Sequence, residues 1–274
     1  MKKKLLTYPY LLWMIIFTII PLFLVLYFSV VQTDQFGTRF TSEHLARVFE
    51  PIYLKVIFRS IALALVSTFF CLVIGYPMAM ILASRELKKR DILVILFVLP
   101  MWMNFLARTY AWMTLLENNG IINQLLLTLG LPTLNILYTD KAVILGMVYN
   151  FLPFMVLPIY SVLRKIDRSL LEAAEDLGAT PVSTFFKVIF PLSLPGVVSG
   201  IIMVFMPAVT TFVISRLLGG GHYMLIGNLI EQQFLATGNW GFGSALSLIL
   251  MAFLLLTMGI MSRTDKDREG GRLW

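Results

Sequence analysis

The sequence predicts an all-α polytopic membrane protein with six transmembrane helices, which form a single transmembrane domain over residues 1–274. Hydrophobic residues make up 58% of the chain and charged residues only 14%, whereas an average soluble domain carries about 25% charged residues. The apolar residues form separate runs of about 22–25 residues, long enough to cross a hydrocarbon core of about 30 Å with some tilt. Basic residues cluster between these runs, which is typical of membrane topology and not of a soluble protein with a large core.

The first apolar run follows Lys2, Lys3 and Lys4 and continues to Val31. It is too long for the apolar core of a signal peptide and lacks a small-residue cleavage site, so we expect it to be retained as a transmembrane helix. Polar segments separate it from five further runs. The predicted spans are residues 9–31, 60–83, 92–116, 142–163, 192–215 and 241–262.

Most of the 22 Lys and Arg residues lie in four segments: the N-terminus, the turn 84–91, the loop 164–190 and the C-terminal tail. Because cytoplasmic loops are enriched in Lys and Arg, these segments and both termini are predicted to be cytoplasmic. The net charge of +7 thus reflects membrane topology and does not indicate nucleic-acid binding.

Several kinds of chemistry lack their motifs in this sequence. Cys71 is the only cysteine and cannot form an internal disulfide, and His44 and His222 are isolated, so no cluster has metal-ligand spacing. A glycine-rich phosphate loop, HExxH and GxSxG are all absent, as is a carboxylate pair within a span. We therefore expect that the chain is not an enzyme, does not hydrolyse ATP and binds no cofactor.

Eight of the twelve prolines fall within the predicted spans, where they indicate either broken helices along a pathway or the ordinary frequency of proline in membrane helices. Gly196 and Gly200 form a GxxxG pair in the fifth span, which predicts a close helix contact within this subunit or with a partner. The prolines are Pro9, Pro21, Pro77, Pro100, Pro153, Pro158, Pro195 and Pro207.

Residues 164–191 form a polar segment between two apolar runs, and its pattern predicts an amphipathic helix, a bend and a second helix. Ser169 followed by Glu172 predicts a capping box at the first helix. Gly178 stands where a helix ends with a residue of positive φ. Thr180 and Pro181 predict the N-cap and first residue of the second helix, and Pro191 is expected to end it.

The same segment carries a recognisable spacing. Glu172-Ala173-Ala174, three residues, Gly178, twelve residues and Pro191 together resemble the EAA loop of ABC-importer permeases. The resemblance implies the type I ABC-importer permease architecture, in which this cytoplasmic loop docks into a cleft of an ATP-hydrolysing subunit. The docking residues that it implies are Glu172, Ala173, Ala174, Asp176, Leu177 and Gly178. The alternative is an interfacial amphipathic helix without a protein partner.

Further stretches resemble the spermidine/putrescine (PotB) type of these permeases, namely residues 100–111, 149–158, 216–220, 226–234 and 239–244. The resemblance implies polyamine uptake across a bacterial cell membrane. It implies as partners two ATP-binding subunits, which hydrolyse the ATP, a second permease subunit of the PotC type, and an extracellular or lipid-anchored polyamine-binding protein. Arg216 and Gly241 depart from the pattern, because many relatives have an acidic residue and a proline there.

A flexible aliphatic polycation needs carboxylates, amide oxygens and aromatic faces along its path. The candidate pathway residues are Trp102, Asn104, Tyr110, Tyr149 and Glu231. Outer Trp and Tyr side chains are also typical of interfacial belts, and Glu231 has Arg216 as an alternative partner. Arg108 lies within an apolar run, where an ionisable residue indicates function or snorkelling to the headgroups.

Three alternatives to polyamine import remain open from the sequence. The chain is an ABC-importer permease for another small solute, such as an opine, an amino-acid derivative or a metal chelate; or it is a channel or secondary transporter that works without ATPase partners; or it is an intramembrane enzyme. The polar segment 164–191 argues against the second, and the missing motifs argue against the third.

Overall fold

The computed structural model describes residues 8–34, 37–84, 90–221 and 224–270. The chain divides into two compact units, Met1–Phe58 with Leu225–Thr257 and Arg59–Met224 with Met258–Trp274. Helices α5 (Pro51–Ala83) and α15 (Trp240–Gly270) begin in the first unit and continue in the second.

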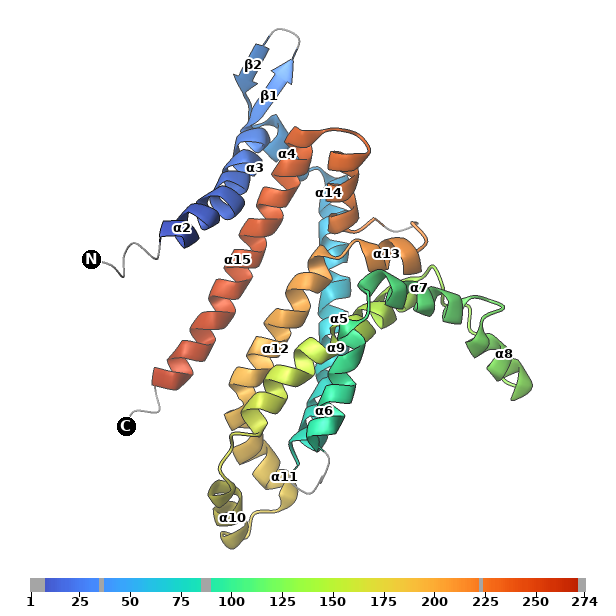
Figure 1. Cartoon of the computed structure of the whole chain (residues 1–274), viewed down its shortest axis with the longest axis vertical. Coiled ribbons are helices and arrows are strands. Elements are labelled where there is room, and N and C mark those ends of the chain that lie inside the picture. Colours follow the sequence, from blue (N-terminus) through green and yellow to red (C-terminus); the bar gives the residue numbers. More distant parts are fainter. Residues whose placement is uncertain (1–7, 35–36, 85–89, 222–223, 271–274) are drawn as a thin grey trace. The chain divides into compact units, whose positions relative to one another are not determined.

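The first unit carries the N-terminal span and a small hairpin (Figure 1). Strands β1 and β2 pair antiparallel with Val31 opposite Phe40 and Asp34 opposite Gly37. In this unit the guanidinium carbon of Arg47 lies 4.5 Å from the centre of the Phe242 ring, which is a cation–π contact. The elements besides the starts of α5 and α15 are α2 (Tyr8–Met14), η1 (Ile15–Ile19), α3 (Ile20–Val30), β1 (Val31–Asp34), β2 (Gly37–Phe40), α4 (Glu43–Val48) and α14 (Ile226–Leu235).

The second unit contains the rest of α5 and most of the other helices (Figure 1). In it α9 and α12 lie side by side, and α10 and α11 lie at the opposite end of α9 from α7 and α13. The elements are α6 (Arg90–Val98), η2 (Leu99–Trp102), α7 (Phe105–Leu116), α8 (Ile121–Thr128), α9 (Asp140–Leu163), α10 (Arg168–Asp176), α11 (Pro181–Thr184), η3 (Phe185–Ile189), α12 (Phe190–Thr210) and α13 (Val213–Leu218).

Small residues bring α9 and α12 into close contact. A Cβ on Gly196 would lie 2.9 Å from the Pro158 carbonyl oxygen, and one on Gly200 would lie 2.8 Å from Met155 Sδ. The predicted GxxxG contact is therefore confirmed, and it is made within this subunit. Van der Waals packing of this kind holds membrane helices together where lipid gives no hydrophobic driving force.

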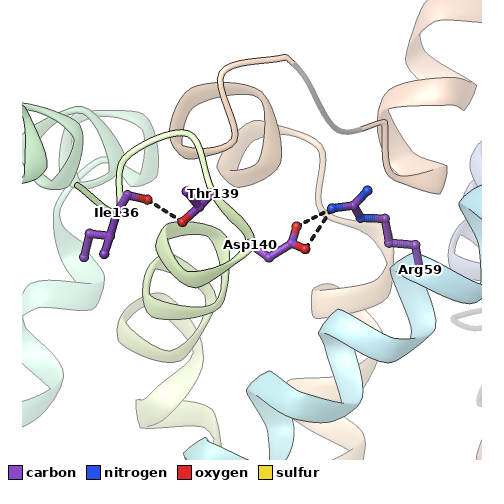
Figure 2. Close-up of polar contacts among 4 residues, drawn as sticks. All are labelled: Arg59, Ile136, Thr139 and Asp140. Carbon is purple, nitrogen blue, oxygen red and sulfur yellow. Dashed lines mark hydrogen bonds and ion pairs between the residues drawn. The ribbon is translucent and has the colours of Figure 1, made fainter. Parts of the chain in front are cut away.

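An ion pair joins α5 to the first residue of α9. One Nη of Arg59 lies 2.7 Å from Oδ1 and 2.8 Å from Oδ2 of Asp140, as Figure 2 shows. In the preceding residue, the Thr139 hydroxyl donates to the Ile136 carbonyl oxygen, so the backbone that leads into α9 is also held.

Five helices in the described residues are long and apolar enough to cross a membrane, and a sixth candidate span is bent by 91° between Asp91–Trp102 and Phe105–Thr128. The six predicted spans agree with this set in place and order. The third is predicted as a single run over 92–116, whereas the structure breaks it after the 3₁₀ turn that contains Pro100. The second span begins at Pro51, nine residues before the predicted start.

Two prolines are accommodated by π-helical turns. The five π residues Ile15–Ile19 precede Pro21, and Phe185–Ile189 precede Pro191. The proline ring would clash with the carbonyl four residues earlier, and a wider turn at that carbonyl relieves the clash. The prediction that Pro191 ends a helix is therefore wrong, because a continuous 30-residue segment runs from Pro181 to Thr210.

Candidate functional site

The polar segment forms the predicted helix–bend–helix, but its first cap differs from the prediction. Helix α10 begins at Arg168, and the side chain of Asp167 accepts a hydrogen bond of 3.1 Å from the Ser169 amide. Glu172 instead pairs with Arg168, with 2.6 Å between Oε1 and Nε. The Ser169–Glu172 capping box is thus wrong, because the helix starts two residues earlier, with Asp167 as its N-cap, and places Arg168 and Glu172 one turn apart on the same face.

The bend is built as the sequence predicts. Gly178 has φ of 76°, and the amides of Gly178 and Ala179 donate to the carbonyls of Glu175 and Ala174. This pair of bonds satisfies carbonyls at the end of α10 in the Schellman arrangement. The Thr180 side chain then accepts from the Ser183 amide at 3.3 Å, so the predicted N-cap of the second helix is also confirmed.

The residues implied to dock a partner are all on this bend or the helix before it. Leu177 is 88% exposed; Glu172, Ala173, Asp176 and Gly178 are exposed and Ala174 is half-buried. The bend therefore presents one large apolar side chain, that of Leu177, to the surroundings of the chain.

A cavity of about 400 Å³ lies beneath α10. It is lined by Met80 and Ala83 of α5 and by Arg164, Leu171 and Glu175, among others. The contact between α10 and α5 is therefore not close-packed at this cavity.

The segment after the bend is tied to the bundle by an aromatic cluster. The ring of Tyr76 in α5 lies 5.7 Å from that of Phe185 and 5.9 Å from that of Phe190. Its hydroxyl is 2.7 Å from the Ser193 hydroxyl. Tyr76 is not among the residues predicted from the sequence; its only signal there is a polar ring in an otherwise apolar span, between Gly75 and Pro77.

Four of the candidate pathway residues lie in the second unit but not in one cluster. Trp102 is 79% exposed and Tyr110 is 49% exposed. The Asn104 side chain caps α7 by accepting from the amides of Leu106 and Ala107. Tyr149 pairs edge-on with Trp112 at 5.2 Å between ring centres. Glu231 lies on α14 in the first unit.

Arg108 is buried on α7, with 8% of its surface exposed. Its guanidinium carbon lies 5.9 Å from the centre of the Phe105 ring, and its Nε has no hydrogen-bond partner among the described residues. A functional role and snorkelling to the headgroups both stay predictions for this side chain.

The family and its fold are shown by comparison with known proteins. Residues 72–269 match the family model described as "Binding-protein-dependent transport system inner membrane component". A bacterial alginate ABC transporter, solved with an alginate-bound periplasmic protein, has a chain of the same fold, with a TM-score of 0.81 at 17% identity over 97% of this chain and 96% of that one. The MetNI methionine ABC transporter matches with a TM-score of 0.55 at 18% identity, over 78% and 94%. The chain therefore belongs to the family of inner membrane components of binding-protein-dependent transport systems, as the EAA resemblance implied.

Within this family, curated relatives are similar over nearly the full length. The spermidine/putrescine transport system permease protein PotB of Haemophilus influenzae is 41% identical over 93% of this chain and 91% of its own. The protein of that name from Escherichia coli is 40% identical over 92% and 94%. The resemblance to the PotB type is thus confirmed, and the chain is a transport component rather than an enzyme.

Proposed function

We propose that this chain is the transmembrane permease of an ATP-driven importer that takes up polyamines, spermidine or putrescine, from a binding protein. Two observations support this: the similarity to PotB permeases and an exposed EAA-type helix that ends in a glycine turn. Of these two observations, the exposed end of α10 is the one that supports coupling of this chain to an ATPase.

In this proposal residues 164–191 are the cytoplasmic coupling loop, both termini are cytoplasmic and residues 1–274 act as one permease domain. The transporter contains two ATP-binding subunits, one of which holds α10 of this chain. A second permease subunit of the PotC type completes the pathway, and this chain binds no cofactor. Closure of the ATPases shifts α10, and the rigid helix from Pro181 carries the displacement to Tyr76 in α5. Only a difference in ATPase affinity between the two permease conformations can drive this change.

The substrate is tested by reconstituting the complete transporter in vesicles with binding protein and labelled spermidine or putrescine. Uptake is expected only with ATP inside the compartment that holds the ATPases. ATP-independent flux would contradict the importer mechanism and favour a channel or secondary transporter. Uptake of another solute, without uptake of polyamines, would contradict the proposed substrate.

The docking surface is tested separately by Leu177→Asp. Loss of a buried anchor at an interface weakens binding tenfold or more, at about 1.4 kcal/mol per factor of ten. We therefore expect the ATPase to be lost on co-purification while the permease remains folded. Phe40→Asp is the matched control, because Phe40 is similarly exposed, at 83%, but lies on β2. Retention of the ATPase by Leu177→Asp would contradict docking at α10.

A further inference from the structure

The loops on both sides of α8 border an open cavity of about 430 Å³, which is in the size range of small-molecule sites. It is lined by Glu117, Asn118, Asn119, Asn135, Leu137 and Tyr138. These residues follow the third span and precede the fourth, so in the proposed topology the cavity opens on the side from which substrate arrives.

The two walls of this cavity are held together by one buried side chain. Asn123 is 1% exposed, and its amide group donates to the carbonyl oxygens of Glu117 and Leu134, both at 3.1 Å. Its carbonyl oxygen accepts from the Leu134 amide at 2.7 Å. Asn123 therefore fixes residue 117 in one wall relative to residue 134 at the start of the other, so the cavity is pre-formed.

The lining is suited to a cation. The carboxylate of Glu117 has no ion-pair partner among the described residues, and it stands at the C-terminal end of α7, where the helix dipole adds negative potential. Carbonyl oxygens gather there as well: a Cβ on Gly120 would lie 2.6 Å from those of both Thr114 and Leu115.

The remaining lining supplies neutral acceptors and an aromatic face. The side-chain amides of Asn118 and Asn135 make no hydrogen bond to a described residue. Tyr138 is 45% exposed and is fixed by its amide, which donates to the Leu218 carbonyl oxygen at 2.8 Å. A primary ammonium group has three donors and is attracted to aromatic faces; a carboxylate, amide oxygens and a phenol ring match it. A strongly hydrated divalent ion would call for more carboxylates.

We propose that this cavity is an entry subsite that binds one ammonium group of an aliphatic polyamine before it reaches the pathway between the spans. The inference rests on the proposed function. Glu117 supplies the charge, Tyr138 the aromatic face, and Asn123 acts only by positioning the walls.

The test uses the purified full transporter without binding protein and measures equilibrium binding of labelled spermidine. A charge-assisted contact is worth about one factor of ten or more in affinity. Glu117→Gln is expected to weaken binding about tenfold, and Tyr138→Leu to weaken it less, whereas Tyr138→Phe keeps the ring and the affinity. Glu43→Gln is the control, since Glu43 is an exposed carboxylate on α4 outside the cavity.

Two results would overturn the subsite: unchanged spermidine affinity in Glu117→Gln, or an equal loss of affinity in the control Glu43→Gln. Either result is distinguishable from failure of the proposed function, because ATP-driven spermidine uptake by the wild-type transporter is measured in the same preparation. If that uptake is present and Glu117→Gln leaves affinity unchanged, only the subsite is wrong.

Discussion

The hydroxyl of Tyr76 in the second span lies 2.7 Å from the hydroxyl of Ser193, twelve residues after the start of the helix that follows the coupling bend. Ser193 also donates to the Phe190 carbonyl oxygen at 2.9 Å, so Tyr76 is attached to that helix by both a polar contact and ring packing. In the proposed function, this contact is the one by which we expect a movement of the coupling segment to reach α5.

Replacing Tyr76 separates the two parts of this contact. Tyr76→Phe removes only the polar contact, worth about 0.6–2 kcal/mol within membrane proteins, so we expect a slightly lower unfolding temperature and nearly normal uptake. Tyr76→Leu also removes aromatic pairs worth about 0.5–1.5 kcal/mol each, and we expect ATP hydrolysis that no longer responds to loaded binding protein. Tyr10→Leu, at an exposed ring of α2, is the control. Fully coupled ATPase activity in Tyr76→Leu would refute the transmission role.

Substitutions of Gly178 are limited by backbone conformation and not by space. Its φ is 76° and a Cβ there would meet nothing within 4 Å. An L-residue in this conformation costs about 1–2 kcal/mol, less for Asn and more for a β-branched residue. Uptake is therefore expected to fall in the order Gly, Asn, Ala, Val while the amount of permease in the membrane stays constant. Equal uptake by Gly178→Asn and Gly178→Val would mean that the bend is not required.

The sequence predicts the elements whose causes are local. Gly178, Thr180 and Pro181 act within one turn of the chain, and apolar runs report on the spans directly, so both are predicted correctly. The start of α10 is mispredicted because Asp167 and Ser169 are both acceptable N-caps and only the path of the chain from α9 selects one. Pro191 is mispredicted as a helix end. The π-helical turn that lets the helix continue past it has no sequence signal of its own.

Contacts between segments that are distant in the chain are harder to predict from the sequence. The GxxxG pattern predicts a close contact, but only the fold shows that Met155 and Pro158 are its partners. Tyr76–Ser193 and the Asn123 contacts join residues whose pairing no periodicity encodes. The candidate pathway residues rest on side-chain chemistry alone, and this leaves their roles as predictions, including that of Asn104, whose oxygen caps α7.

Alanine substitutions should separate packing glycines from unconstrained ones. At Gly196 an added Cβ would lie 2.9 Å from a backbone oxygen, whereas at Gly200 the nearest atom is the flexible Met155 Sδ. Gly196→Ala is therefore expected to lower the unfolding temperature more than Gly200→Ala, with a cost of about 1–3 kcal/mol for overpacking. Gly259→Ala is the control in α15, where a Cβ would meet nothing within 4 Å. A drop in Gly259→Ala as large as in Gly196→Ala would show that the loss is not due to helix contact.

The Arg59–Asp140 pair is open to a double-mutant cycle. Its side chains are 34% and 43% exposed, so solvent screens the pair and a coupling energy of about 0.2–1 kcal/mol is expected. Arg59→Leu, Asp140→Leu and the double variant are compared by thermal unfolding at low and high salt. The coupling should shrink as salt rises. Additive effects at low salt would show that the pair does not stabilise the contact between α5 and α9.

Arg108 is buried and its Nε has no hydrogen-bond partner within the part of the chain that the structure describes. Its replacement is therefore expected to affect stability and activity in opposite directions. Removing a buried unpaired charge is often stabilising, because the desolvation of an ion costs several kcal/mol. Arg108→Met is therefore expected to leave the unfolding temperature of the purified chain unchanged or raise it, and to lower uptake by the assembled transporter, where an ionisable residue within a span is kept for function. Arg108→Lys keeps the charge but not the planar fork, so it should restore uptake only in part. A lower unfolding temperature in Arg108→Met, with uptake intact, would instead make Arg108 a structural residue that packs on Phe105.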